Sequence, residues 1–143
     1  MLGREAIAAR VPHAGRMVLL ERVIGWDERT ILCATRTHLD PANPLRDASG
    51  LPVWAAIEYA AQAAAVHGSL LQDAATPRTG VLAGARGVHA FCRRLDDIEG
   101  ELEIRATLVH ADPAGAIYEF EASAAGRVLL SGRSTLMYSK AAA

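Results

Sequence analysis

The chain has 143 residues, of which 51% are hydrophobic and 22% are charged, and its formal net charge is −1. This size and composition are typical of a single globular domain, spanning residues 1–143, and exclude an intrinsically disordered chain. A net charge close to zero with scattered arginines also gives no basis for expecting nucleic-acid binding.

The first part of the chain predicts a short helix followed by a β-hairpin. Residues 2–10 have the pattern of a short helix, and residues 11–15, which include a proline and a glycine, break it. Residues 17–26 are apolar and rich in branched side chains, which predicts a mostly buried strand, and residues 30–37 alternate as a second strand would. Because only a short turn separates these two strands, we expect them to pair in antiparallel fashion.

A long buried helix is predicted over residues 51–72, and the rest of the chain is expected to pack around it. This segment contains seven alanines between Ala55 and Ala65, which favour helix and permit close packing. Because it is apolar on nearly every face, the helix should be buried on most sides. One carboxylate, Glu58, lies in its middle, with Gln62 one turn further on the same side. A carboxylate inside a buried helix is unfavourable unless it is paired, neutral or functional.

Four further strands are predicted after this helix, at residues 81–91, 101–111, 117–124 and 127–138. The glycines of the first of these strands indicate a bulge or a close approach of its backbone to a neighbour. Residues 38–50 and 73–80 are expected to be irregular, because both combine proline with other turn-forming residues. The expected fold is therefore α+β, an antiparallel sheet of five to six strands wrapped around one long central helix.

The two cysteines, Cys33 and Cys92, lie singly in apolar surroundings without metal-ligand spacing, so we expect buried free thiols. Free thiols and an N-terminus without a signal-peptide segment favour a cytoplasmic protein. The helix at residues 51–72 contains a carboxylate, an amide and an imidazole, which makes it a poor membrane span. The sequence has no Cys/His cluster with metal-ligand spacing, so we expect no metal site. The glycines of residues 80–87 lack the strand-to-helix context of a phosphate-binding loop.

Three motifs resemble, in order and spacing, those of the hotdog-fold β-hydroxyacyl thioester dehydratases of fatty-acid synthesis. Residues 11–13 (VPH) followed by residues 17–23 (MVLLERV) are similar to the entry into that family's first strand. Residues 57–62 (IEYAAQ) are similar to its helix signature, and residues 81–84 (VLAG) to a later strand. The resemblance covers residues 10–138 and is greatest to the divergent branch associated with aryl polyene synthesis.

The resemblance implies removal of water from a 3-hydroxyacyl thioester on an acyl carrier protein, without a cofactor, in fatty-acid-like or polyene synthesis. The reaction needs a base near C2, an acid near the C3 hydroxyl and donors on the thioester oxygen. We assign His38 as the base, because imidazole can be neutral at working pH, and Glu58 as the acid, because it lies on an apolar helix. The backbone N–H groups of Val53 and Trp54 at the helix start are expected to bind the thioester carbonyl, and Gln62 to orient the carboxyl group.

In the resembled family the histidine and the acid of one site come from different subunits, so we expect a homodimer or a heterodimer of hotdog chains. Two departures from the family pattern are visible. His38 opens the loop that corresponds to the family's catalytic loop, but Glu58 follows twenty residues later instead of fourteen. The family's Pro-Gly at the helix entrance is Pro52-Val53 here. Trp54 and residues 43–46 are expected to shape the acyl pocket.

Two other functions fit the same residues. A hotdog thioesterase would use Glu58 as nucleophile or base and would not require a histidine in the loop. A non-catalytic subunit would instead stabilise or shape a partner dehydratase. Each assigned residue also has a structural alternative: His38 as a turn residue that bonds the loop backbone, and Glu58 as a structural acid paired with a buried arginine or with a helix end across an interface.

The remaining histidines and the later arginines are expected to have structural or solvated roles. His13, which resembles a family position, should order the N-terminal segment, with a catalytic role as the alternative. His67 should lie on the helix surface or at an interface, and His89 and His110 should lie on strands. The arginines at positions 78, 86, 93 and 94 are expected to be solvated, with contact to an acidic carrier protein or a phosphopantetheine phosphate as the alternative.

Overall fold

The computed structural model describes residues 2–11, 13–72 and 79–139. Its elements in chain order are β1 (Leu2–Gly3), α1 (Arg4–Ala8), the 3₁₀ turn η1 (Gly15–Met17), β2 (Arg22–Trp26), β3 (Thr30–Thr35), the 3₁₀ turns η2 (Thr37–Leu39) and η3 (Val53–Ala55), α2 (Ala56–Leu71), β4 (Thr79–Ala90), β5 (Leu102–Asp112), β6 (Gly115–Ala124) and β7 (Arg127–Ser139).

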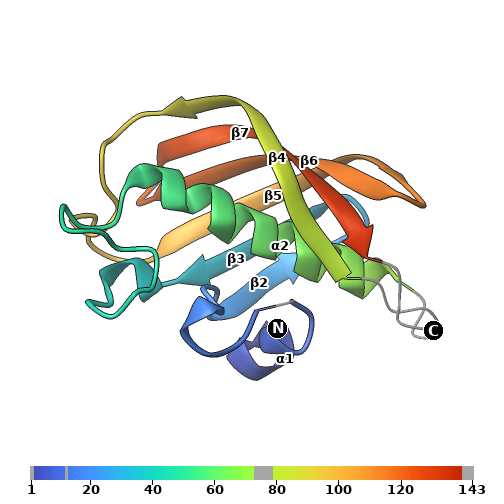
Figure 1. Cartoon of the computed structure of the whole chain (residues 1–143), viewed down its shortest axis with the longest axis horizontal. Coiled ribbons are helices and arrows are strands. Elements are labelled where there is room, and N and C mark those ends of the chain that lie inside the picture. The colour runs from blue at the N-terminus through green and yellow to red at the C-terminus, as the bar shows by residue number, and fades with distance from the viewer. Residues whose placement is uncertain (1, 12, 73–78, 140–143) are drawn as a thin grey trace.

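Within the described ranges, seven antiparallel strands form one sheet in the order β1-β2-β3-β5-β6-β7-β4. Helix α2 lies across one face of this sheet, with β3, β5 and β6 behind it in the view of Figure 1. Its alanines are buried around most of the helix, and this small surface lets the sheet approach closely. The α+β fold with a sheet around one central helix is therefore confirmed.

Turn residues determine how the strands connect. In the β2–β3 turn, Asp27 Oδ1 accepts hydrogen bonds from the backbone N–H groups two and three residues later. These bonds favour the carboxylate and hold the pKa of Asp27 below its usual value. Asp112 makes the same two bonds in the β5–β6 turn. The β6–β7 turn uses Ala125 and Gly126, both with positive φ (51° and 78°), as a tight two-residue hairpin requires.

The sheet has more strands than expected because residues 2–3, predicted as helix, pair with β2 before α1 begins. Strand β2 begins only at Arg22, whereas the sequence predicts a strand from residue 17. The buried residues 18–20 contact the core ahead of the sheet, so the apolar run reflects burial and not strand pairing. The predicted hairpin and the later strands are confirmed with small differences at their ends. Most of the predicted loop at residues 73–80 falls outside the described residues.

Strand β4 forms one edge of the sheet, and it is bulged. Its register against β7 shifts between Leu82 and Gly84 and again between residues 86 and 89, which confirms the bulge predicted from the glycines. A Cβ atom on Gly80 would lie 3.0 Å from the side chain of Leu136 and 3.9 Å from that of Ala65 on α2. The start of β4 therefore runs close to α2, which it crosses in Figure 1.

Both cysteines are free thiols; Cys33 is fully buried and Cys92 is partly buried. Burial raises the pKa of the Cys33 thiol to about 12, so this side chain packs as a small apolar group. Among the helices of the described ranges, none combines the length and the hydropathy needed to cross a membrane.

Candidate active site

A pocket of about 300 Å³ lies between α2 and the start of β4. Helix α2 contributes four lining residues spaced by three or four positions, which places them on one face: Glu58, Ala61, Gln62 and Ala65. Residues 80–82 of β4 and His13 complete the lining. The alanines and Gly80 leave space, and a few polar groups converge on it. This combination is typical of a site for a small organic ligand.

Glu58 presents the only carboxyl group that lines this pocket. Its side chain is partly buried on the first turn of α2. It has no hydrogen-bond or ion-pair partner among the described residues, so the structure gives no support to the alternative of a structural acid with a partner in the same chain. A partly buried carboxyl group that the fold does not use is available to a ligand.

Gln62 is bonded to the chain ahead of β2. Its Nε2 donates to the carbonyl of Met17, and its Oε1 accepts from the backbone N–H of Leu19 at 2.9 Å. Both ends of the amide are thus occupied, and neither bond involves Glu58. Gln62 fixes residues 17–19 on α2, in place of the role in orienting the Glu58 carboxyl group that the sequence suggested.

His13 lines the same pocket as Glu58, although the sequence favoured a role in ordering the N-terminal segment. It is partly buried, and its Nδ1 is enclosed without a hydrogen-bond partner. No local signal in the sequence reveals this placement. It depends on residues 13–19 folding back onto α2, which the amide of Gln62 secures from 45 positions along the chain.

His38 lies on η2 and does not line the Glu58 pocket. Its side chain has no exposed surface, and its Nε2 lies 3.0 Å from the carbonyl oxygen of Ile98. Burial lowers the pKa of His38, which keeps the imidazole neutral. In this conformation the ring has no exposed surface with which to contact a substrate. The role as base would require the loop to open.

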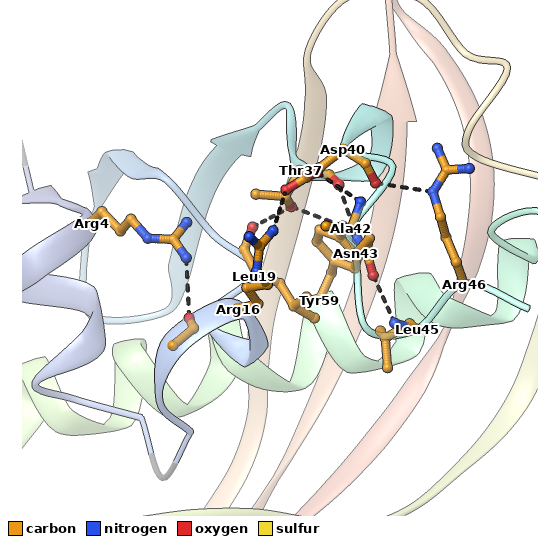
Figure 2. A network of polar contacts seen from close by, with 11 residues as sticks. Arg4, Arg16, Leu19, Thr37, Asp40, Ala42, Asn43, Leu45, Arg46 and Tyr59 are labelled. Carbon is orange, nitrogen blue, oxygen red and sulfur yellow. Dashed lines mark hydrogen bonds and ion pairs between the residues drawn. The ribbon is translucent and has the colours of Figure 1, made fainter.

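The loop around His38 is fixed to α2 by a polar network (Figure 2). The Tyr59 hydroxyl lies 2.9 Å from both Thr37 Oγ1 and Asn43 Nδ2. Thr37 Oγ1 also donates to the carbonyl of Leu19 at 2.6 Å, and Asn43 Nδ2 donates to the carbonyl of Thr37 at 2.9 Å. Tyr59 is fully buried and Asn43 nearly so, which makes this network part of the core. Opening the loop would break several buried hydrogen bonds at once.

The helix entrance is bonded to the chain that follows β4. The Val53 N–H donates to the carbonyl of Arg93 at 2.9 Å, and the Leu51 N–H donates to Asp96 Oδ1 at 2.9 Å. The Leu95 N–H donates to the carbonyl of Leu51 in return. The expectation that the Val53 N–H is free to bind a thioester carbonyl is therefore wrong, because a backbone carbonyl of the same chain already occupies it.

Trp54 has an exposed side chain, 54% accessible, and does not line the Glu58 pocket. A separate pocket of about 310 Å³ lies at the helix entrance. It is lined by Asp47, Ser49, Gly50, Pro52, Arg93 and Arg94. The side chain of Trp54 does not line this second pocket either. The expected contribution of Trp54 to an acyl pocket stays a prediction.

His67 is fully buried, so the prediction that it lies on the helix surface or at an interface is wrong. Its Nδ1 lies 2.7 Å from the Tyr118 hydroxyl and its Nε2 lies 2.8 Å from the carbonyl oxygen of Asp27. Because a carbonyl only accepts, Nε2 carries the proton and Nδ1 accepts from the tyrosine. Burial lowers the pKa of His67, consistent with a neutral ring.

His89 and His110 lie on β4 and β5, as expected, and are exposed. Arg86, Arg93 and Arg94 are exposed, as expected for solvated residues, while Arg78 lies outside the described residues. In residues 2–11, 13–72 and 79–139, no group of three or more histidine, cysteine or acidic side chains is arranged to hold a metal ion.

Comparison with known proteins gives a family and a set of structural relatives. A family model described as ApeP-like, ApeP dehydratase, matches residues 5–143. The chain is 29% identical to a solved structure of the dehydratase heterocomplex ApeI:P from Xenorhabdus doucetiae, with a TM-score of 0.81, covering 98% of this chain and 93% of that one. No curated protein sequence matches the chain.

Thioesterases share the fold at lower sequence identity. A thioesterase from Haemophilus influenzae is 14% identical with a TM-score of 0.69, covering 98% of this chain and 92% of that one. A thioesterase from Pseudomonas aeruginosa, solved as a mutant, is 14% identical with a TM-score of 0.65, covering 84% of this chain and 81% of that one. These two similarities show the fold alone.

Proposed function

Because the chain belongs to the ApeP-like dehydratase family, we propose that it acts in a 3-hydroxyacyl-[acyl-carrier-protein] dehydratase and that Glu58 donates the proton to the departing hydroxyl group. The observation that carries this proposal is the Glu58 carboxyl group, which has no partner among the described residues and lies in a pocket lined mainly by alanine, glycine and aliphatic side chains. An apolar pocket accepts an acyl chain, and the Glu58 carboxyl group lies at its lining.

The chemistry requires a proton to leave C2 and the hydroxyl group to leave C3 as water, which creates the double bond of an enoyl thioester. Glu58, protonated before the reaction, supplies the proton that turns the hydroxyl group into a good leaving group. No metal or cofactor is needed for this elimination, because the thioester carbonyl already acidifies the C2 proton. The natural carrier of the acyl group is expected to be a phosphopantetheine arm of an acyl carrier protein, in fatty-acid-like or aryl polyene synthesis.

A second hotdog chain is expected to pack against β4, as a homodimer or as a heterodimer. In the described part of the chain, β4 is an edge strand with one paired side, along β7. Its exposed residues include Val81, which is 49% accessible and also lines the Glu58 pocket. An unpaired strand edge tends to pair with another chain, and a partner here would close the pocket from outside. The two free thiols suit the reducing cytoplasm, where we expect the reaction to occur.

The decisive experiment follows the mass of a thioester substrate. The protein is purified from its own host with any bound partner, then incubated with 3-hydroxyacyl thioesters on carrier protein and with the matching saturated thioesters. We expect the hydroxyacyl species to lose 18 Da, the mass of one water, and the saturated species to remain intact. Release of free acid from both would identify a thioesterase instead.

The variant Glu58→Gln tests the assigned acid, because the amide keeps the shape and cannot donate a proton of comparable acidity. We expect the rate of water loss to fall at least about 100-fold, the range seen for removal of a general acid. Glu28→Gln in the exposed β2–β3 turn is the matched control and should leave the rate unchanged. Water loss in Glu58→Gln within a few-fold of wild type would show that the chain is a non-catalytic subunit or uses another acid.

A further inference from the structure

Dehydration needs a base as well as an acid, and the Glu58 pocket contains one further titratable side chain, His13. The Nδ1 of His13 is enclosed and has no hydrogen-bond partner. Its Nε2 forms no hydrogen bond within the described residues either and does not belong to the buried unpaired atoms. Because Nδ1 is enclosed, Nε2 is the ring nitrogen that is open to a ligand in the pocket, and it has no hydrogen-bond partner among the described residues.

The two fully buried histidines, His67 and His38, have no ring nitrogen that is open to this pocket. His67 has both ring nitrogens bonded, to Tyr118 and to the carbonyl of Asp27. His38 is bonded to the carbonyl of Ile98, and its unpaired Nδ1 lies in a side chain with no exposed surface. His13 is therefore the histidine that combines access to the Glu58 pocket with free hydrogen-bonding capacity in the part of the chain that the structure describes.

The segment that carries His13 is held firmly at the pocket. Gln62 bonds the backbone of Met17 and Leu19, and it does so from the same face of α2 that presents Glu58. The turn η1 adds a backbone bond from the Val18 N–H to the carbonyl of Gly15 at 3.1 Å. Residues 18–20 are buried in the core and anchor the end of this segment. The amide of Gln62 thus holds the chain that follows His13 against the face of α2 that presents Glu58.

We propose that His13 is the base that removes the C2 proton, so that both catalytic groups of the Glu58 pocket come from one chain. This inference rests on the proposed dehydratase function. The neutral ring of His13 takes the C2 proton, the C2–H electron pair forms the C2=C3 bond, and the C3–O bond breaks as Glu58 protonates the hydroxyl group. His13 ends as imidazolium and Glu58 as carboxylate, and a proton passes back from one to the other after the enoyl thioester and water leave.

The test replaces His13 by Gln and by Asn in the purified, partner-bound protein and follows water loss from the hydroxyacyl thioester. Both variants should lose at least about 100-fold in kcat/KM, the range expected for a general base. His110→Asn, an exposed strand residue, is the matched control and should retain the wild-type rate. Unfolding midpoints of all variants show whether each is folded, and a loss of rate confined to a folded His13 variant supports the proposal.

A pH profile separates a catalytic from a merely positioning role. In the wild type, kcat/KM should fall on the acidic side as the base becomes protonated. In His13→Gln this acidic limb should disappear from the residual rate, which an effect on structure alone would not cause. Wild-type kinetics in folded His13→Gln, with Glu58→Gln still inactive, would overturn the assignment of His13 and leave the dehydratase proposal standing. Absence of water loss in the wild type would instead overturn the proposed function.

Discussion

The polar side chains of helix α2 differ in burial and in hydrogen bonding. On one side, Tyr59 and His67 are fully buried, and every polar atom of their side chains bonds a group of the same chain. On the side of the pocket, Glu58 is only partly buried and has no partner among the described residues. Because successive helix positions differ by about 100°, neighbours such as residues 58 and 59 face different surroundings. The fold accounts for Tyr59, for His67 and for Gln62, which is bonded although it lines the pocket, and it leaves Glu58 for a ligand.

The largest difference in the free energy of unfolding should appear between His67→Ala and Glu58→Ala, which truncate one side chain on each side of α2. His67→Ala removes both hydrogen bonds, leaves Tyr118 and the Asp27 carbonyl without their partner, and opens a cavity. We expect a loss of about 2–4 kcal/mol in the free energy of unfolding. Glu58→Ala should change it by less than about 1 kcal/mol, because no bond within the described chain is lost. Urea denaturation at pH 7.5 measures both, and an equal loss in the two variants would remove the distinction between the sides.

Acidification should act on two buried and bonded histidines, His67 on α2 and His38 on η2. Burial lowers the pKa of His38 and of His67 in the folded state below the ordinary value of 6.5. Below that pH the unfolded chain therefore binds more protons than the folded one, so stability is fully present above about pH 6.5 and falls as the pH decreases. Each histidine contributes up to about 1.4 kcal/mol per pH unit until its folded pKa is reached.

Urea denaturation at pH 7.5, 6.5 and 5.5 measures this dependence. His67→Gln and His38→Gln should each reduce the slope below pH 6.5, because the substituted side chain does not titrate. His110→Gln, an exposed residue on β5, is the control for a histidine outside the core. A free energy of unfolding that stays constant from pH 7.5 to 5.5 would contradict the role assigned to the buried rings.

The sequence predicts the helix and the sheet that form the site better than it predicts the contacts of the site residues. The seven alanines and the strand patterns predict the central helix in its sheet, and the four-residue spacing predicts that Glu58 and Gln62 share a face. Periodicity reports which face of an element a residue occupies, and that information is local. The residues that pack against each face are determined by contacts between distant parts of the chain, and a local sequence pattern does not predict these contacts.

His38 and His13 illustrate this limit. His38 is assigned as the base from the sequence because it opens the loop that corresponds to the family's catalytic loop, but in the structure it is buried and bonded to the carbonyl of Ile98, 60 residues away. His13 reads as an ordering residue, and its place in the pocket depends on the bonds from Gln62 to residues 17–19. Val53 shows the same effect at the helix entrance, since its N–H is occupied by the carbonyl of Arg93 from beyond β4. In each case a long-range polar bond decides the role.

The smallest expected effect is that of removing the Tyr59 hydroxyl, and it tests how separate the two sides of α2 are. In Tyr59→Phe, Thr37 Oγ1 still donates to the carbonyl of Leu19 and Asn43 Nδ2 still donates to that of Thr37. The loss should therefore be only about 1 kcal/mol in the free energy of unfolding. Water loss from a hydroxyacyl thioester should stay within twofold of wild type, because the hydroxyl lies in the bonded network (Figure 2). A large loss of rate with unchanged stability would mean that the loop beside Tyr59, and not the Glu58 pocket alone, takes part in the reaction.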